Sequence, residues 1–144
     1  MNAVPSRHIL FSHTPPEHGS LSREILLVDD SPTLLMSITS VLERNGYAVT
    51  RAASAEDGLA QMRTHGFGLV IADYHMPGMN GVEMIRQARR LPAMRFTPIL
   101  LLSNDSGHAA RAEARAAGAT GWLLKPVSAA DLMQVLGQVI PDRG

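Results

Sequence analysis

Five polar residues, each at the end of a short apolar segment, have side chains suited to phosphate chemistry. Three are aspartates, Asp29, Asp30 and Asp73, and the others are Ser103 and the single lysine, Lys125. Three carboxylates brought close together repel one another by about 4 kcal/mol per pair at 4 Å in an effective dielectric near 20, so we expect a cation among them. Mg²⁺ fits because it prefers oxygen ligands and keeps several waters.

A carboxylate beside such a cation can attack a phosphoryl group and form an aspartyl phosphate. Asp73 is the candidate nucleophile, Lys125 its counter-ion, and the Ser103 hydroxyl a donor to a phosphoryl oxygen. The chain contains twelve arginines and one lysine. A compact ammonium suits a tight phosphate site better than a planar guanidinium, which favours a role for Lys125 in the site over a position as an ordinary surface lysine.

Five strand-like segments alternate with five helical patterns and would position these residues. The strand segments are Glu24–Val28, Tyr47–Ala52, Leu69–Asp73, Pro98–Leu102 and Gly121–Leu124. The helices are expected to begin at Ser31, Ser54, Gly81, His108 and Ser128, and to end near Asn45, Thr64, Arg90, Ala117 and Pro141. This alternation predicts an α/β fold with a parallel sheet covered by helices on both faces. The carboxyl ends of parallel strands share one edge, where ligands bind in such sheets.

Length and composition predict one folded domain. The 144 residues are 45% hydrophobic and 18% charged, which is ordinary globular usage. We expect a flexible N-terminal tail over residues 1–22, a domain over 23–140 and a short C-terminal end over 141–144. The tail carries three histidines, His8, His13 and His18, but a metal site there is disfavoured because their spacing on a flexible segment provides no fixed geometry.

Charge and cysteine content exclude several classes of protein. Lys and Arg number 13 against 13 Asp and Glu, so no basic field indicates direct nucleic-acid binding. The absence of cysteine excludes disulfides and thiolate metal sites and fits a reducing compartment. No segment has the pattern of a signal peptide or the length of a membrane span, and we therefore expect a cytoplasmic protein.

Four motifs, in this order on alternating strands, resemble the receiver domain of two-component response regulators. They are Leu27–Asp30, Asp73–Gly81, Ser103 and Lys125-Pro126, and the resemblance covers about residues 23 to 140. It implies a flavodoxin-like (CheY-like), doubly wound, five-stranded parallel sheet with five helices. It also implies a phosphoprotein of two-component signal transduction that is not an enzyme but assists its own phosphorylation and dephosphorylation.

The resemblance also implies specific roles in the site. Asp73 would be the phospho-acceptor, receiving its phosphoryl group from a sensor histidine kinase or a histidine phosphotransfer domain. Mg²⁺ would be bound by Asp30, Asp73 and the backbone carbonyl of His75, with Asp29 acting through water. The Lys125-Pro126 peptide bond would be cis, which would direct the lysine into the site.

A conformational switch is implied as well. Ser103 would move toward the phosphoryl group and Trp122, the aromatic residue of the fifth strand, would turn inward; the alternative is a tryptophan merely packed on the surface. His75 and Asp105 occupy positions that tune the lifetime of the phosphoryl group in this family, although His75 alternatively acts only through its backbone. The segment Arg115–Trp122 most resembles chemotaxis-class regulators.

Two functions follow from the resemblance. The first is a stand-alone response regulator, a monomer or weak dimer, that docks a protein target in trans through the fourth helix, fifth strand and fifth helix, since only residues 141–144 follow the last helix. The second is a phosphorelay intermediate or phosphate sink that passes the group between histidines. A haloacid-dehalogenase-like phosphatase is disfavoured because His75 stands where that family needs a second acid, and the glycine motifs of nucleotide-binding domains do not occur.

Overall fold

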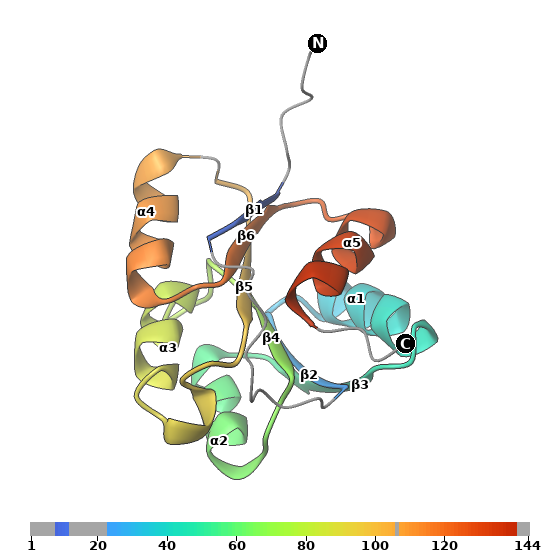
Figure 1. Cartoon of the computed structure of the whole chain (residues 1–144), viewed down its shortest axis with the longest axis horizontal. Helices are drawn as coiled ribbons and strands as arrows, with labels where there is room; N and C mark the ends of the chain where they lie inside the picture. The colour runs from blue at the N-terminus through green and yellow to red at the C-terminus, as the bar shows by residue number, and fades with distance from the viewer. Residues whose placement is uncertain (1–7, 12–22, 106, 141–144) are drawn as a thin grey trace.

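The computed structural model describes residues 8–11, 23–105 and 107–140, which form a sheet with helices on both faces (Figure 1). The strands are β1 His8–Leu10, β2 Glu24–Val28, β3 Ala48–Ala52, β4 Leu69–Asp73, β5 Ile99–Ser103 and β6 Gly121–Leu124. The helices are α1 Pro32–Arg44, α2 Ala55–Thr64, α3 Gly81–Ala88, α4 His108–Ala117 and α5 Ala129–Val139, with a short 3-10 helix, η1, at Pro92–Met94.

The sheet has six strands in the order β1-β6-β5-β4-β2-β3. Strands β2 to β6 are parallel, whereas β1 pairs with β6 in the antiparallel direction. The prediction of a five-stranded sheet was therefore one strand short. Residues 8–11 lie in the segment that we expected to be a flexible tail; the rest of that tail and the C-terminal end at 141–144 lie outside the described residues. Three apolar residues among prolines and serines carry too weak a local pattern to predict β1, which forms because β6 offers a free edge.

Alternating side chains of the parallel strands divide the core into two layers. In β2, Leu26 and Val28 face the layer that contains residues of α2, α3 and α4, whereas Ile25 and Leu27 face the layer that contains residues of α1 and α5. All four side chains are fully buried. Because both faces of the sheet are covered, its strands are almost continuously apolar, as the sequence predicted.

Polar caps fix the starts of four helices. Ser31, Ser54, Asn80 and Ser128 each accept a hydrogen bond from the backbone N–H three residues further on, which satisfies one of the free donors of the first turn. These caps place the first residues of α1, α2, α3 and α5 directly after the loops at the strand ends. The longest helix, α1, has 13 residues, and no helix in the described part of the chain is long and apolar enough to cross a membrane.

Helix α3 ends at Ala88, two residues before the predicted end, and the side chain of the next residue, Arg89, holds this end in place. Its guanidinium donates to three backbone carbonyls outside the helix, at 2.6 Å to Met94, 2.7 Å to Thr97 and 2.8 Å to Gly118. Burial lowers the pKa of Arg89 from its ordinary value. The side chain thereby joins the end of α3 to the loop before β5 and to the end of α4.

Candidate functional site

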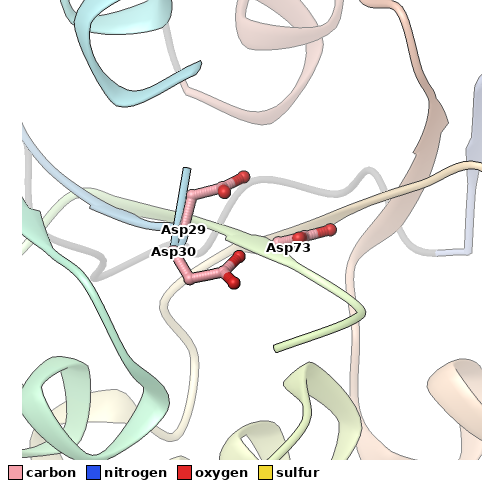
Figure 2. Close-up of side chains that lie close together, drawn as sticks. All are labelled: Asp29, Asp30 and Asp73. Carbon is pink, nitrogen blue, oxygen red and sulfur yellow. The ribbon is translucent and has the colours of Figure 1, made fainter. Parts of the chain in front are cut away.

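Three aspartates lie side by side at one edge of the sheet. Asp29 and Asp30 follow β2, and Asp73 ends β4, which pairs in parallel with β2 so that Val28 lies opposite Ala72. This register brings the two strand ends together. Figure 2 shows the three carboxylates close to one another, and an oxygen of each lies within 4.8 Å of the others. The predicted convergence of these acids is present in the structure.

Lys125 reaches this cluster from the end of β6. Its Nζ lies 3.0 Å from Oδ1 of Asp73 and 3.8 Å from Oδ2 of Asp29. The peptide bond between Lys125 and Pro126 is cis. The ammonium contacts two of the three carboxylates, and three acids beside one ammonium leave the cluster with excess negative charge.

Asp29 is the most deeply buried of the three aspartates. Its side chain is 1% exposed, and although Oδ1 accepts a hydrogen bond of 2.8 Å from the Ser31 N–H, Oδ2 has no hydrogen-bond partner among the described residues. Burial raises the pKa of Asp29 above its ordinary value; the Ser31 N–H and Lys125 lower it, and the charge of Asp73 raises it further. A buried carboxylate oxygen without a donor, next to two other acids, suits a hard divalent cation such as Mg²⁺.

Ser103 ends β5, the strand that lies between those of Asp73 and Lys125. The residue is fully buried, and its Oγ accepts a hydrogen bond of 2.9 Å from the Asp105 N–H. Its carbonyl accepts a bond of 2.9 Å from the Lys125 N–H. The strand order thus brings the predicted hydroxyl to the same sheet edge as the acids and the lysine.

The two positions expected to tune phosphoryl lifetime differ in their surroundings. His75 has an exposed side chain whose ring meets that of Tyr74 edge-on, with 4.6 Å between centroids. The Asp105 carboxylate accepts a hydrogen bond of 2.7 Å from the Gly107 N–H and so stabilises its own loop. The metal-ligand role of the His75 carbonyl and the tuning roles of both residues remain predictions.

Trp122 is buried, with 1% of its surface exposed, so the alternative of a tryptophan packed on the surface is wrong. Its Nε1 donates to the carbonyl of Asp105 at 3.1 Å, and its ring lies 5.4 Å from that of Tyr74. The Tyr74 hydroxyl donates to Glu113 on α4 at 3.3 Å, and burial, followed by the charge of Glu113, raises the pKa of Tyr74. Sequence reasoning missed Tyr74, although an aromatic residue directly after the nucleophile was a usable signal.

Gly81 has a second role that sequence reasoning missed, since it was predicted only as the start of a helix. A Cβ on Gly81 would lie 2.6 Å from the backbone oxygen of Asp73 and 2.8 Å from Leu101 Cδ2. The Gly81 N–H also donates to the Tyr74 carbonyl at 2.9 Å. Only glycine allows α3 to begin directly against the backbone that carries the nucleophile.

Most of the chain matches one known protein family. The family model of the response regulator receiver domain matches residues 25–137, most of the chain. The chain belongs to this receiver family. The motifs that carried the resemblance are those that the fold gathers at one sheet edge, so sequence and geometry agree on the family.

Receivers similar to this chain occur both as separate proteins and as parts of larger ones. The sensory/regulatory protein RpfC of Xanthomonas campestris pv. campestris is 38% identical over 138 residues, which is 93% of this chain but 19% of RpfC, so the chain spans about a fifth of that relative. The chemotaxis protein CheY4 of Vibrio cholerae has a TM-score of 0.80 at 35% identity, over 82% of this chain and 98% of CheY4. The receiver domain of sensor histidine kinase PA1611 from Pseudomonas aeruginosa PAO1, solved with magnesium in its active-site cleft, has a TM-score of 0.78 at 27% identity, over 84% of this chain and 99% of that domain. These likenesses support the predicted CheY-like, flavodoxin-like α/β fold.

Proposed function

We propose that this receiver domain accepts a phosphoryl group on Asp73 from a histidine of a sensor histidine kinase or a histidine phosphotransfer domain. The observation that carries the proposal is the contact of 3.0 Å between Lys125 Nζ and Asp73 Oδ1 inside a cluster of three acids. A nucleophile with an ammonium beside it, at the carboxyl edge of a parallel sheet, is the arrangement that phosphoryl transfer to a carboxylate needs.

The transfer step follows from the side chains in the site. A carboxylate oxygen of Asp73 forms a bond to phosphorus while the bond between phosphorus and the donor's imidazole nitrogen breaks, and the electron pair stays on that nitrogen. The Lys125 ammonium offsets charge on the transferring oxygens. The Ser103 hydroxyl can donate its proton to a phosphoryl oxygen while its Oγ still accepts from the Asp105 N–H.

The donor set of the site fits Mg²⁺. In the proposal Asp30, Asp73 and the His75 carbonyl hold the ion directly and Asp29 acts through water, in keeping with the buried Oδ2 of Asp29, which has no hydrogen-bond partner among the described residues. When bound, the ion would neutralise charge that develops on the phosphoryl oxygens. The related PA1611 receiver, which has magnesium in its active-site cleft, supports this assignment.

The proposed output is the docking of a protein target in trans on the surface of α4, β6 and α5. Ser103 and Trp122 would transmit the state of Asp73 to this surface, because Asp105 bonds to both. A chemotaxis-type pathway is supported by the likeness to CheY4. In this proposal the protein is cytoplasmic, a monomer or weak dimer without direct nucleic-acid binding, and a phospho-accepting signalling domain, not an enzyme.

A second candidate function is that of a phosphorelay intermediate or phosphate sink. It is favoured by the likeness to RpfC, a sensory/regulatory protein, and to the receiver of a sensor histidine kinase. Rapid, reversible transfer between Asp73 and a histidine phosphotransfer domain would support a relay. A phosphoryl mimic that changes target docking, without such transfer, would support the stand-alone regulator.

Intact mass after incubation with phosphoramidate and Mg²⁺ tests the proposal. We expect one phosphoryl adduct on the wild type and on Asp57→Asn, which removes an exposed acid of α2, and none on Asp73→Asn. An adduct on Asp73→Asn equal to that of the wild type would refute the assignment of the acceptor. Omission of Mg²⁺ should slow formation of the adduct.

A further inference from the structure

Residues 8–11 cover the outer edge of β6, the strand that carries Trp122. His8, Ile9 and Leu10 lie opposite Leu123, Trp122 and Gly121, and the Phe11 N–H donates to the Thr120 carbonyl at 2.8 Å. Hydrogen-bonded pairs alternate along an antiparallel ladder, so Ile9 faces Trp122 as a hydrogen-bonded pair. Figure 1 shows β1 at the end of the sheet beside β6, which would otherwise be the exposed edge strand.

The fit between the two strands is specific. A Cβ at Gly121 would lie 2.7 Å from Leu10 Cδ2 and 3.0 Å from the Ile9 carbonyl, so the glycine provides the space that β1 occupies. Leu10 packs against the core layer of α1 and α5, and Phe11 packs against the layer of α2, α3 and α4. The short strand therefore closes both layers of the core at this edge.

A continuous set of contacts joins this edge to the acidic site. Ser103, at the site, accepts from the Asp105 N–H at 2.9 Å, and the Asp105 carbonyl accepts from Trp122 Nε1 at 3.1 Å. Trp122 in turn pairs with Ile9. A shift of Ser103 toward a phosphoryl group on Asp73 would move the Asp105 loop, which holds the indole of Trp122. Because Trp122 also pairs with β1, the shift would disturb that pairing.

We propose that β1 is a displaceable cover of the β6 edge, held in place while Asp73 is unmodified and loosened when Asp73 is phosphorylated. This deepens, and rests on, the proposed phosphoryl-acceptor function. Phe11 also forms one wall of a groove of about 590 Å³ along α4, whose other lining residues are His108, Arg111, Ala112, Arg115 and Ala116. Release of β1 would uncover β6 and remove that wall, so β1 and a target docking on α4 and β6 compete for the same surface.

Coupling between Asp73 and β1 must act in both directions. If phosphorylation weakens the pairing of β1 by some factor, then weakening β1 must favour the phosphorylated state by the same factor. Leu10→Asp places a carboxylate in the apolar contact with the core and should release the strand. This variant should therefore bind the phosphoryl mimic beryllofluoride more tightly than the wild type, as followed by Trp122 fluorescence.

Amide hydrogen exchange on the full chain, resolved by NMR, tests the cover directly. With Mg²⁺ and beryllofluoride, exchange at Ile9 and Phe11 should accelerate by about tenfold, within the usual range of coupling between sites. The amide of Val70, which donates to the Pro98 carbonyl inside the sheet, serves as the reference and should not change. Leu10→Asp should exchange rapidly at both positions even without the mimic.

Phe96→Asp is the matched control, because Phe96 is an apolar residue that is 73% exposed and lies outside this edge. In this variant, amide exchange in β1 should equal that of the wild type. Unchanged protection of Ile9 and Phe11 when the mimic is bound would overturn the coupling, and unprotected amides in the wild type would overturn the cover itself. Binding of the mimic is measured separately by fluorescence. If the mimic does not bind, the acceptor function and the coupling that rests on it are both refuted. If the mimic binds but exchange in β1 is unchanged, only the coupling is refuted.

Discussion

Asp29→Asn should stabilise the Mg²⁺-free protein and remove most of the stability gained from Mg²⁺. The Asp29 carboxylate is buried, with one oxygen that has no hydrogen-bond partner among the described residues. The substitution keeps an oxygen that can accept from the Ser31 N–H and removes the negative charge. It therefore separates the cost of the charge from the packing of the side chain.

Two opposing interactions of the Asp29 carboxylate set the size of this effect on the free energy of unfolding. The Asp29 and Asp73 carboxylates have oxygens within 4.8 Å of each other, so at an effective dielectric of 20 their repulsion is at least about 3.5 kcal/mol, whereas attraction to Lys125 at 3.8 Å is about 4.4 kcal/mol. These terms nearly cancel, so the cost of burying an unsatisfied charged oxygen decides the sign. We expect Asp29→Asn to raise the free energy of unfolding by about 1 to 2 kcal/mol without Mg²⁺.

The pH dependence of stability provides an independent check. Because the pKa of Asp29 is raised in the folded state, the folded protein retains the proton to higher pH than the unfolded chain does. Stability of the Mg²⁺-free wild type should therefore fall as the pH rises from the ordinary value of 3.8 through the raised pKa. Asp29→Asn should lack this component of the decline.

Urea denaturation of both proteins with EDTA or with saturating Mg²⁺ is the assay. If the folded site binds Mg²⁺ as proposed, the ion should stabilise the wild type and should stabilise Asp29→Asn much less. Asp57→Asn, which removes an exposed acid, should keep the full Mg²⁺ effect. A loss of stability in Asp29→Asn without Mg²⁺ would refute the view that burying this charge costs more than its attraction to Lys125 returns.

Three further substitutions test the scaffold and the site. Arg89→Met should lower the free energy of unfolding by about 2 to 4 kcal/mol, because three backbone carbonyls lose a charged donor, whereas Arg86→Met on the exposed face of α3 should change it by less than about 1 kcal/mol in urea denaturation. Gly81→Ala should cost about 1 to 3 kcal/mol in the same assay, because its Cβ would lie against backbone, whereas Gly66→Ala, with no atom within 4 Å of the added Cβ, should be nearly neutral. Lys125→Gln should form the aspartyl phosphate at least about tenfold more slowly, as followed by intact mass, and a rate equal to that of the wild type would contradict the role of its ammonium.

Much of the site was predictable because strand ends are visible in the sequence. Apolar runs that stop at Asp29, Asp73, Ser103 and Lys125 mark where each strand ends, and parallel pairing then forces those ends to one edge. The serine caps of α1, α2 and α5 were equally local. Such features depend on a few neighbouring residues, so the sequence carries them in full.

The features that were not predicted depend on tertiary partners. β1 forms only because the β6 edge is free and Gly121 leaves space for Leu10. These partner residues lie more than a hundred positions away from β1 in the sequence. The contacts of Trp122 with the carbonyl of Asp105 and the ring of Tyr74 likewise depend on the folded sheet. Local patterns cannot reveal contacts of this kind, because each needs the folded sheet to bring its partners together.

Trapping the modified residue tests the central claim most directly. After incubation with phosphoramidate and Mg²⁺, reduction with borohydride converts an aspartyl phosphate into homoserine, and peptide mass mapping locates the altered residue. We expect a single altered position, Asp73, the last residue of β4. Alteration at Asp29 or Asp30 in place of Asp73, or no alteration under conditions that label another receiver domain, would contradict this assignment.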